Sequence, residues 1–391
     1  MTTTINNEHK KLNVPNLRFP EFQGEWEEHL LGNISDVTKL AGFEFTKYVT
    51  YEDNGNIIAI RGLNCKNGSL DLRDVKYIDN SDFSKLSRSK LYTGDILYTY
   101  VGTVGEVAVV DKNDKYYLAP NVSRIRLSKD YNSDFIKQLL GSKKFYNQIV
   151  FPLIATSSQP ALSMENLRKF KLKVPSIREQ TKIASLLNAI DERIATQNKI
   201  IEDLKKLKSA ITDLLFHSIA DAHTIRLGKI AHITNGAGDV QDANTEHQED
   251  WYPFFDRSEE LKWFPTYSFD KEAVIYAGEG QSFYPRYYNG KFALHQRCYA
   301  ITDFASCIIP KYCYHFMNTL NSYFVRNSVG STVPSLRMDI FQKVEIRLPL
   351  IPKQQHICKI IDAFYTKLEV EQRGISILQE LKQFLLSQMF I

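Results

Sequence analysis

Cysteine is scarce in this chain of 391 residues, and long apolar runs are missing. The five cysteines are odd in number and none belongs to a CxxC spacing, which argues against a disulfide framework. No uninterrupted apolar run approaches the roughly 18 to 20 residues of a membrane helix, and the polar residues 1–10 lack the apolar stretch of a signal peptide. These absences predict a soluble protein of the reducing cytoplasm.

Signatures of catalysis are missing as well. No GxxxxGKS or GxxxxGKT string provides a phosphate-binding loop, and the short glycine pairs at 102–105 and 278–280 lack the third glycine of a dinucleotide site. No HExxH or GxSxG pattern occurs. The densest group of possible metal ligands fits no zinc spacing: His295, Cys298, Cys307, Cys313 and His315. The sequence therefore predicts a chain with no catalytic centre, metal ion or bound cofactor of its own.

The composition is that of a folded globular protein. Hydrophobic residues make up 43% of the chain and charged residues 24%, with only 18 glycines and 13 prolines, which excludes a largely disordered or collagen-like chain. About two or three domains are expected at this length. The formal net charge of +4 is too small to indicate a nucleic-acid partner by itself.

An internal repeat decides the domain organisation. Residues 170–183 align without gaps to residues 344–357, at an offset of 174. The same offset aligns Pro160 with Pro334, Leu162 with Leu336, Met164 with Met338, Pro175 with Pro349 and Phe216 with Phe390. A weaker match pairs residues 31–34 with 227–230 at an offset of 196, so the first half contains 22 additional residues.

Each half consists of a β-rich block followed by one long helix. The blocks alternate short runs of Val, Ile, Tyr and Phe with Gly, Asn and Asp, as in Asp95–Val101 and Glu106–Val110, which is typical of strands and hairpins. Ser176 stands three residues before Glu179, a spacing that predicts a capping box at the start of the first helix. Pro352 fits the first position of the second helix. The predicted fold class is α+β.

Apolar residues recur in each helix at alternating steps of four and three, the heptad pattern of a coiled coil. In the first helix they are Ile183, Leu187, Ile190, Ile194, Ile201, Leu204, Ile211 and Leu215. In the second helix they are Ile357, Ile361, Phe364, Leu368, Ile375, Leu378, Leu385 and Met389. An ordinary amphipathic helix against a globular core is the alternative, but about 40 residues of unbroken seam exceed its usual length.

The connectivity indicates how the two helices pack. The first helix leads from one block to the other and the second begins where the second block ends, so an antiparallel coiled coil needs no additional chain to join the seams. Polar residues interrupt both seams, and we expect Lys208 to meet Glu371 and Gln197 to meet Lys382. This register is a hypothesis that rests on the cost of an unpaired charge in an apolar seam.

Two similar blocks on helices of this length suit a ligand with two similar, spaced parts. At 1.5 Å per residue the helices would span about 60 Å. Duplex DNA is such a ligand, because its grooves recur about every 34 Å and spaced half-sites are read by geometry.

Short motifs in and around the blocks match a known family. They are Pro15–Phe22 with Trp26, Leu31–Gly32, Gly94–Tyr98 with Gly102 and Gly105, and Pro175–Gln180. Over essentially the whole chain, the sequence resembles the specificity (S) subunit of bacterial type I restriction-modification enzymes. The resemblance implies two β-rich target-recognition domains in tandem repeat, each reading one half of a bipartite DNA target. They are separated by two helices that form an antiparallel coiled coil.

The resemblance also implies partners, their cofactors and domain boundaries. The helices would dock two modification subunits, which bring S-adenosylmethionine and methylate adenine. Restriction subunits with translocase and nuclease activity join the same complex, so ATP and Mg are expected on partner subunits. The expected boundaries are an N-terminal extension at 1–25, target-recognition domains at 26–175 and 218–348, and spacer helices at 176–217 and 349–391. Residues 352–355 are only a loose copy of 178–181, so equal docking at the two ends stays open.

Candidate DNA contacts in the second block form one cluster. Residues 1–177 contain 24 basic and 20 acidic residues, whereas residues 218–348 contain 13 and 15, so phosphate attraction there must be local. The cluster comprises Arg286, Lys291, Gln296 and Arg297. Its cations can neutralise phosphates or donate to guanine, and its glutamine can pair with adenine. Cross-strand packing is the alternative for the neighbouring tyrosines.

Candidate contacts elsewhere lie in basic runs and polar loops. In the first block they are Lys85, Arg88 and Lys90, with Lys112 and Lys115 on a predicted hairpin turn. The loops before the helices add Thr156, Ser157, Ser158 and Gln159 in the first half, and Ser331 and Thr332 in the second. A solvated surface explains the basic runs equally well, and a capping turn explains the loops.

Two other functions are compatible with parts of this pattern. A self-contained DNA methyltransferase or nuclease with degenerate motifs would bind its cofactor without partner subunits. A structural protein with protein or glycan ligands would show no salt-dependent affinity for DNA. The repeat and the seams favour DNA recognition at two spaced sites, and the resemblance implies a non-catalytic DNA-recognition and scaffolding subunit.

Overall fold

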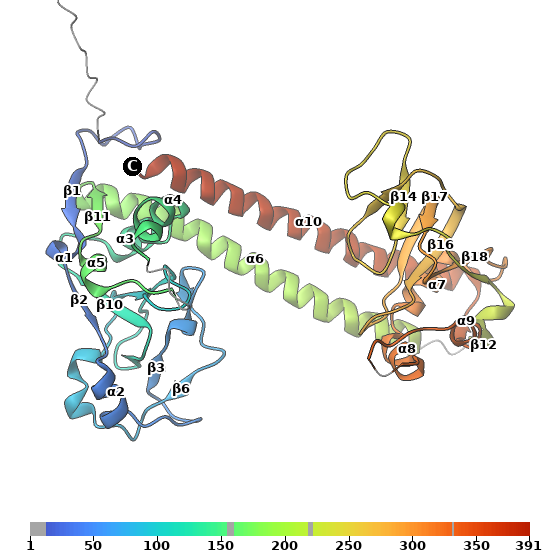
Figure 1. Cartoon of the computed structure of the whole chain (residues 1–391), viewed down its shortest axis with the longest axis horizontal. Helices are drawn as coiled ribbons and strands as arrows, with labels where there is room; N and C mark the ends of the chain where they lie inside the picture. The colour runs from blue at the N-terminus through green and yellow to red at the C-terminus, as the bar shows by residue number, and fades with distance from the viewer. Residues whose placement is uncertain (1–12, 155–159, 218–221, 331) are drawn as a thin grey trace, which may run out of the picture. The chain divides into compact units, whose positions relative to one another are not determined.

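The computed structural model describes residues 13–154, 160–217, 222–330 and 332–391. The chain divides into two compact units: unit 1 is Met1–Asn198 with Gly374–Ile391, and unit 2 is Lys199–Arg373. Each unit therefore contains one β-rich block and a part of both long helices, α6 (Ile177–His217) and α10 (Ile351–Met389) (Figure 1). Within the described ranges, no helix is both long and apolar enough to cross a membrane.

Unit 1 contains two main sheets. One is antiparallel, in the order β2 (Ser35–Lys39), β10 (Val122–Leu127), β7 (Ile96–Thr99) and β8 (Val107–Val109). The other has the order β6 (Lys76–Tyr77), β3 (Ile58–Ile60) and β9 (Tyr116–Leu118), with β3 parallel to β9. Two small pairs are β1 (Glu27–Leu30) with β11 (Lys171–Val174), and β4 (Cys65–Lys66) with β5 (Ser69–Leu70). The short helices are α1 (Leu31–Ile34), α2 (Gly42–Tyr48), α3 (Ser133–Leu140), α4 (Lys143–Phe145) and α5 (Met164–Arg168).

Unit 2 is built around one six-stranded sheet. Its order is β13 (His232–Asn235), β18 (Cys298–Thr302), β16 (Phe269–Ala277), β17 (Arg286–Leu294), β14 (Tyr252–Phe255) and β15 (Lys262–Phe264), and β14 is parallel to β17. A separate pair joins β12 (His223–Arg226) to β19 (Glu345–Leu348). The helices are α7 (Pro310–Met317), α8 (Asn321–Asn327) and α9 (Met338–Gln342).

The two units repeat one plan. In unit 1, β10 lies between β2 and β7 and β3 is parallel to β9; in unit 2, β18 lies between β13 and β16 and β14 is parallel to β17. The N–H of Leu31 donates to the carbonyl of Phe170 at 2.8 Å, and Leu227 donates to Val344 at 2.8 Å. The predicted tandem repeat of two β-rich domains is confirmed.

The long helices pack through their heptad positions, and within each unit they run antiparallel. In unit 1, Leu187 near the start of α6 shares a core with Met389 at the end of α10. In unit 2, Phe216 at the end of α6 shares a core with Ile357 near the start of α10. All predicted seam residues are buried or half-buried. The predicted antiparallel pairing is therefore confirmed in both units.

The predicted partner of Lys208 is wrong. Its ammonium group lies 4.0 Å from the ring centroid of Tyr365, six residues before the expected Glu371. Glu371 instead pairs with Lys367 on its own helix. A cation over an aromatic face is stabilised without a carboxylate, and a half-buried lysine keeps its charged end near water. Pairing of opposite charges was therefore a poor guide to this position.

The predicted partner of Lys382 is also wrong by six residues. Its ammonium group pairs with Asp191 at 2.6 Å, and not with Gln197, which is buried in the seam. Asp191 also accepts from the side chain of Gln138 on α3, at 2.7 Å. Lys382 thus pairs with a carboxylate that lies beside the seam. The prediction had considered partners at seam positions only.

A buried glutamine near the start of each long helix ties the adjoining block to that helix. Gln180 donates to the backbone carbonyl five residues earlier at 2.8 Å and accepts from the N–H of Asn132, which caps α3, at 2.9 Å. Gln354 makes the same two bonds at the same distances, the second with the N–H of Ile309 before α7. The loose copy at 352–355 therefore keeps the residue that makes these contacts.

The start of α6 is also tied to the N-terminal segment. The carboxylate of Glu179 accepts two hydrogen bonds from Arg18, at 2.8 and 2.7 Å, and lies 3.4 Å from the indole nitrogen of Trp26. The predicted capping box is half correct, because the Ser176 hydroxyl accepts from the N–H of Glu179 at 3.5 Å but the carboxylate binds Arg18. Pro352 is the second residue of α10, one later than expected.

His315 makes the stability of unit 2 depend on pH. This α7 residue is buried, its Nε2 lies 2.9 Å from Oδ1 of Asp362 on α10, and its Nδ1 has no hydrogen-bond partner among the described residues. Burial lowers the pKa of His315 and outweighs the opposing effect of Asp362. The unfolded chain therefore binds the proton at higher pH than the folded chain, so stability falls as pH drops below about 6.5.

We expect this group to remove up to about 1.4 kcal/mol of unfolding free energy per pH unit below that point. Urea unfolding of the wild type and of His315→Gln at pH 7.5 and 5.5 measures the effect. The variant should lose less stability on acidification than the wild type does. Equal losses would show that His315 does not titrate in this way.

Candidate nucleic-acid interface

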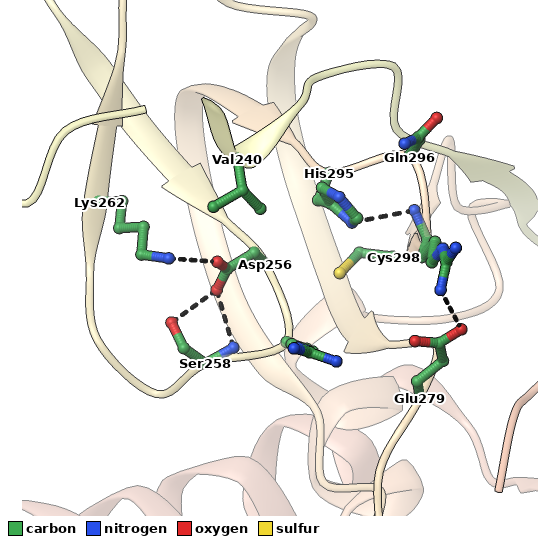
Figure 2. Close-up of a pocket in the computed structure, with 10 residues that line it drawn as sticks. Val240, Asp256, Ser258, Lys262, Glu279, His295, Gln296 and Cys298 are labelled. Atoms are coloured by element: carbon green, nitrogen blue, oxygen red, sulfur yellow. Dashed lines mark hydrogen bonds and ion pairs between the residues drawn. The ribbon is translucent and has the colours of Figure 1, made fainter. Parts of the chain in front are cut away.

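Unit 2 has a polar recess at one edge of its six-stranded sheet (Figure 2). The recess lies where β14 and β17 end, because these strands are parallel neighbours and the chain leaves both at the same end. The recess has a volume of about 490 Å³ and is lined by Val240, Asp256, Arg257, Ser258, Lys262, Glu279, His295, Gln296, Arg297 and Cys298. Residues far apart in the sequence thus converge on one place.

A buried carboxylate organises one wall of the recess. Asp256, directly after β14, accepts from the ammonium group of Lys262 at 2.6 Å and from the hydroxyl and N–H of Ser258 at 2.6 and 2.8 Å. Burial alone would raise the pKa of Asp256, but these donors outweigh it and hold the pKa below its usual value. The ionised carboxylate fixes the loop that carries Arg257.

The opposite wall presents exposed donors. Nη1 of Arg297 donates to Oε1 of Glu279, which is labelled in Figure 2, at 2.8 Å. The Arg297 side chain remains 66% exposed. Gln296 and Arg257 are exposed, and neither side chain has a hydrogen bond within the described part of the chain. Guanidinium and amide groups held at the rim of a recess are suited to acceptors on a large polar ligand, such as base edges or phosphates.

Unit 1 has a smaller recess at the equivalent place. It measures about 300 Å³ and is lined by Tyr51, Arg61, Gly62, Leu63, Thr99, Val101, Thr103, Pro120 and Asn121. Arg61 follows β3 as Asp256 follows β14, and Asn121 precedes β10 as Arg297 precedes β18. The same point of the shared plan therefore opens to the surface in both units.

Pro160 and Pro334, which precede α5 and α9, accept equivalent backbone hydrogen bonds beside the two recesses. The N–H of Gly102 donates to the carbonyl of Pro160 at 2.9 Å, and the N–H of Gly280 donates to that of Pro334 at 3.0 Å. These glycines have φ angles of +78° and +155°, in the region that favours glycine. Both lie next to recess residues, Val101 and Glu279.

Arg61 is the cation of the unit 1 recess. Its Nη2 donates to the backbone carbonyl and to Oδ1 of Asp74, both at 2.9 Å. Its Nε is buried and has no hydrogen-bond partner among the described residues. An incoming acceptor, such as a phosphate or a base oxygen, would match the remaining donors of this guanidinium.

The structure brings together half of the cluster predicted in the second block. Gln296 and Arg297 line the recess. Arg286 is adjacent, since its guanidinium donates to the carbonyl of the recess residue Ser258. Lys291 does not line the recess; its ammonium group lies 4.7 Å from the ring centroid of Tyr267. Contact of these residues with DNA stays a prediction.

The basic residues predicted in the first block do not line the unit 1 recess: Lys85, Arg88, Lys90, Lys112 and Lys115. The ammonium group of Lys90 pairs with Asp114 at 2.6 Å. The turn around residues 110–115 is no hairpin, because β8 pairs with β7 and β9 pairs with β3 in another sheet. The two short strands were predicted correctly, but the sequence did not show that β8 and β9 belong to different sheets.

The predicted polar loops fall only partly within the structure. Thr156, Ser157, Ser158, Gln159 and Ser331 lie outside the described residues. Thr332 is exposed and stands two residues before Pro334, the acceptor of the bond from Gly280. Thr332 itself does not line the unit 2 recess.

Four residues at the recesses escaped the sequence argument: Arg61, Asn121, Arg257 and Glu279. None belongs to a run of basic residues, which was the signal that we used. The repeat of strands relates one of them to a predicted residue, because alignment of Tyr116–Ile125 with Phe292–Ile301 places Asn121 opposite Arg297. The alignment at an offset of 174 does not hold there, and the pairing is evident only from the strands.

Comparison with known proteins identifies relatives for both halves. The family model of the type I restriction modification DNA specificity domain matches residues 23–206 and 220–383. The type I restriction enzyme EcoDI specificity subunit of Escherichia coli is 30% identical over 165 residues, 42% of this chain and 36% of that protein. The putative type I restriction enzyme MjaX specificity subunit of Methanocaldococcus jannaschii is 23% identical over 224 residues, 53% of this chain and 49% of that protein. The chain thus spans less than half of either relative.

Solved structures share the fold. The S subunit of a type I restriction-modification system from M. genitalium aligns with a TM-score of 0.66 and 16% identity, covering 97% of this chain and 99% of that one. A chain from a study of complex assembly in a type I restriction-modification system aligns with a TM-score of 0.58 and 16% identity, covering 93% and 97%.

Proposed function

The chain belongs to the family of type I restriction modification DNA specificity domains, and on this premise we propose that it is the DNA-recognition subunit of a type I restriction-modification complex. Unit 1 and unit 2 each read one half of a bipartite DNA target. The chain itself is not an enzyme and acts in the cytoplasm.

One observation carries this proposal: two units of the same plan each open a recess where a pair of parallel strands ends, β3 and β9 in unit 1 and β14 and β17 in unit 2. A recess with arginine and amide groups fits the acceptor-rich surface of DNA. A duplicated reader implies a duplicated epitope, so the target consists of two short sequences and a gap. The long helices, which join the units, set the length of that gap.

The same helices are proposed to dock two modification subunits. In unit 1, α10 exposes Ile377, Leu381 and Phe384 at steps of four and three, which places them on one face. In unit 2, α6 exposes Ile200, Leu207 and Leu214 at steps of seven. Exposed apolar stripes on helices that already bury a seam are typical of surfaces for partner helices.

The chemistry is proposed to reside in the partners. The modification subunits bring S-adenosylmethionine, and restriction subunits with translocase and nuclease activity use ATP and Mg. Calorimetry of the isolated chain with S-adenosylmethionine separates this function from a self-contained methyltransferase. We expect no measurable heat of binding; tight binding without partners would favour the alternative.

We expect the affinity of the assembled complex for duplex DNA to fall steeply with salt. If about six phosphates are neutralised, the association constant should fall about a thousandfold between 50 and 200 mM salt. Fluorescence anisotropy with a labelled duplex measures the slope, and single-stranded DNA of the same length is the control. An affinity independent of salt would contradict DNA recognition and favour a protein or glycan ligand.

A further inference from the structure

Asn121 and Arg297 occupy the same position in the two units. Each ends a three-residue connection: Ala119–Asn121 joins β9 to β10, and His295–Arg297 joins β17 to β18. The N–H of Ala119 donates to the carbonyl of Ile60, the last residue of β3, at 2.9 Å. The N–H of His295 donates to the carbonyl of Phe255, the last residue of β14, at the same distance. Both side chains are exposed at the rim of a recess. The two units thus present different groups to the same place on their ligands.

Arg297 is held ready for a ligand. Its bond to Glu279 uses one end of the guanidinium, and Glu279 is itself only 22% exposed. Most of the Arg297 side chain is exposed at the rim. A planar guanidinium that is already oriented loses less freedom when it forms two parallel hydrogen bonds.

Asn121 is held by its backbone. Its φ angle is +72°, which asparagine tolerates better than most residues, and its carbonyl accepts from the N–H of Tyr100 at 3.1 Å. Its side-chain amide has no hydrogen bond within the described part of the chain. The amide is therefore available to a ligand from a fixed backbone position.

The difference between these residues indicates base contacts and not phosphate contacts. A contact that neutralises phosphate is equally useful in both units and would be made by a cation in each, whereas Asn121 is neutral. Arginine donates two parallel bonds to N7 and O6 of guanine, and asparagine pairs with N7 and N6 of adenine. Provided that the chain reads DNA as proposed above, we propose that Arg297 reads a guanine in the half-site of unit 2. Asn121 reads an adenine at the corresponding place in the half-site of unit 1.

Arg297→Lys tests this proposal, because it keeps the charge and removes the paired donors. The motif is first determined by mapping methylated bases in a host that expresses the wild-type chain. The purified complex is then assayed for binding to duplexes in which each motif position is changed in turn. We expect the wild type to discriminate about 5- to 150-fold for guanine at one position, and the variant to lose most of that preference there alone.

Two further variants complete the test. Asn121→Gly, which accepts the positive φ, should relax one adenine in the other half of the motif. Arg226→Lys, on the exposed face of β12, is the control and should change nothing.

The outcomes separate this inference from the proposed function. A gapped motif whose guanine and adenine preferences survive both variants overturns the inference alone, as does a uniform loss of affinity at all positions. The inference is also overturned if Arg297→Lys changes the preference in one half of the motif and that half contains no guanine. Absence of any gapped motif in the wild type overturns the proposed function, and this inference with it.

Discussion

Replacing Gln354 with leucine is expected to lower the free energy of unfolding of unit 2 by about 2 to 5 kcal/mol. The buried amide accepts from the N–H of Ile309 and donates to the carbonyls of Pro349 and Cys307, each within 2.9 Å. Leucine fills a similar volume but satisfies none of these groups, and each buried group left without a partner costs about 1 to 3 kcal/mol. Differential scanning calorimetry measures the shift.

The repeat supplies the matched controls. Gln355→Leu changes the exposed neighbour and should alter stability by no more than about 0.5 kcal/mol. Gln180→Leu makes the equivalent change in unit 1 and should move a different part of the transition. If Gln354→Leu and Gln180→Leu destabilised the same part of the thermal transition, or if neither changed the transition, these glutamines would not be what ties each block to its helix.

Introducing charge into the apolar stripe of α10 is expected to prevent assembly without unfolding the chain. The Leu381 side chain is 43% exposed and its neighbour Phe384 is 57% exposed, so Leu381→Glu buries no charge in the free chain. In the complex the same carboxylate would be enclosed by apolar groups, at a cost of about 2 to 4 kcal/mol, which weakens binding about 30-fold or more. Titration of the modification subunit against the chain measures the loss.

Gln383→Glu is the control for this change. It adds the same charge to an exposed position two residues further along α10. We expect near wild-type assembly from Gln383→Glu and an unchanged melting temperature for Leu381→Glu. Full assembly with Leu381→Glu would exclude this stripe as a docking surface.

The arrangement of the long helices was predictable because it depends on a repeated signal. Apolar residues at heptad spacing define the seam, and the connectivity leaves antiparallel packing as the simplest solution. The register of the two helices was not predictable, because it depends on individual side-chain contacts that the heptad spacing does not reveal. Lys208 lies over Tyr365 and Lys382 pairs with Asp191, neither of which is an opposite charge within the seam.

The recesses were harder to predict than the helices. Runs of basic residues pointed to Lys85–Lys90 and Lys112–Lys115, whereas the structure builds its recesses from single residues after different strands. Asp256 and Arg297 line the same recess only because β14 and β17 are parallel neighbours. Parallel pairing joins distant segments, and no local pattern in the sequence announces it. The cluster around Gln296 and Arg297 was found because it happens to be continuous in sequence.

Mapping of methylated bases across the genome of a host, with and without the gene for this chain, tests the central claim most directly. The account predicts a motif of two short specified sequences separated by a gap of fixed length, methylated only when the gene is present. A continuous motif, a gap of varying length or an unchanged pattern of methylation would contradict it.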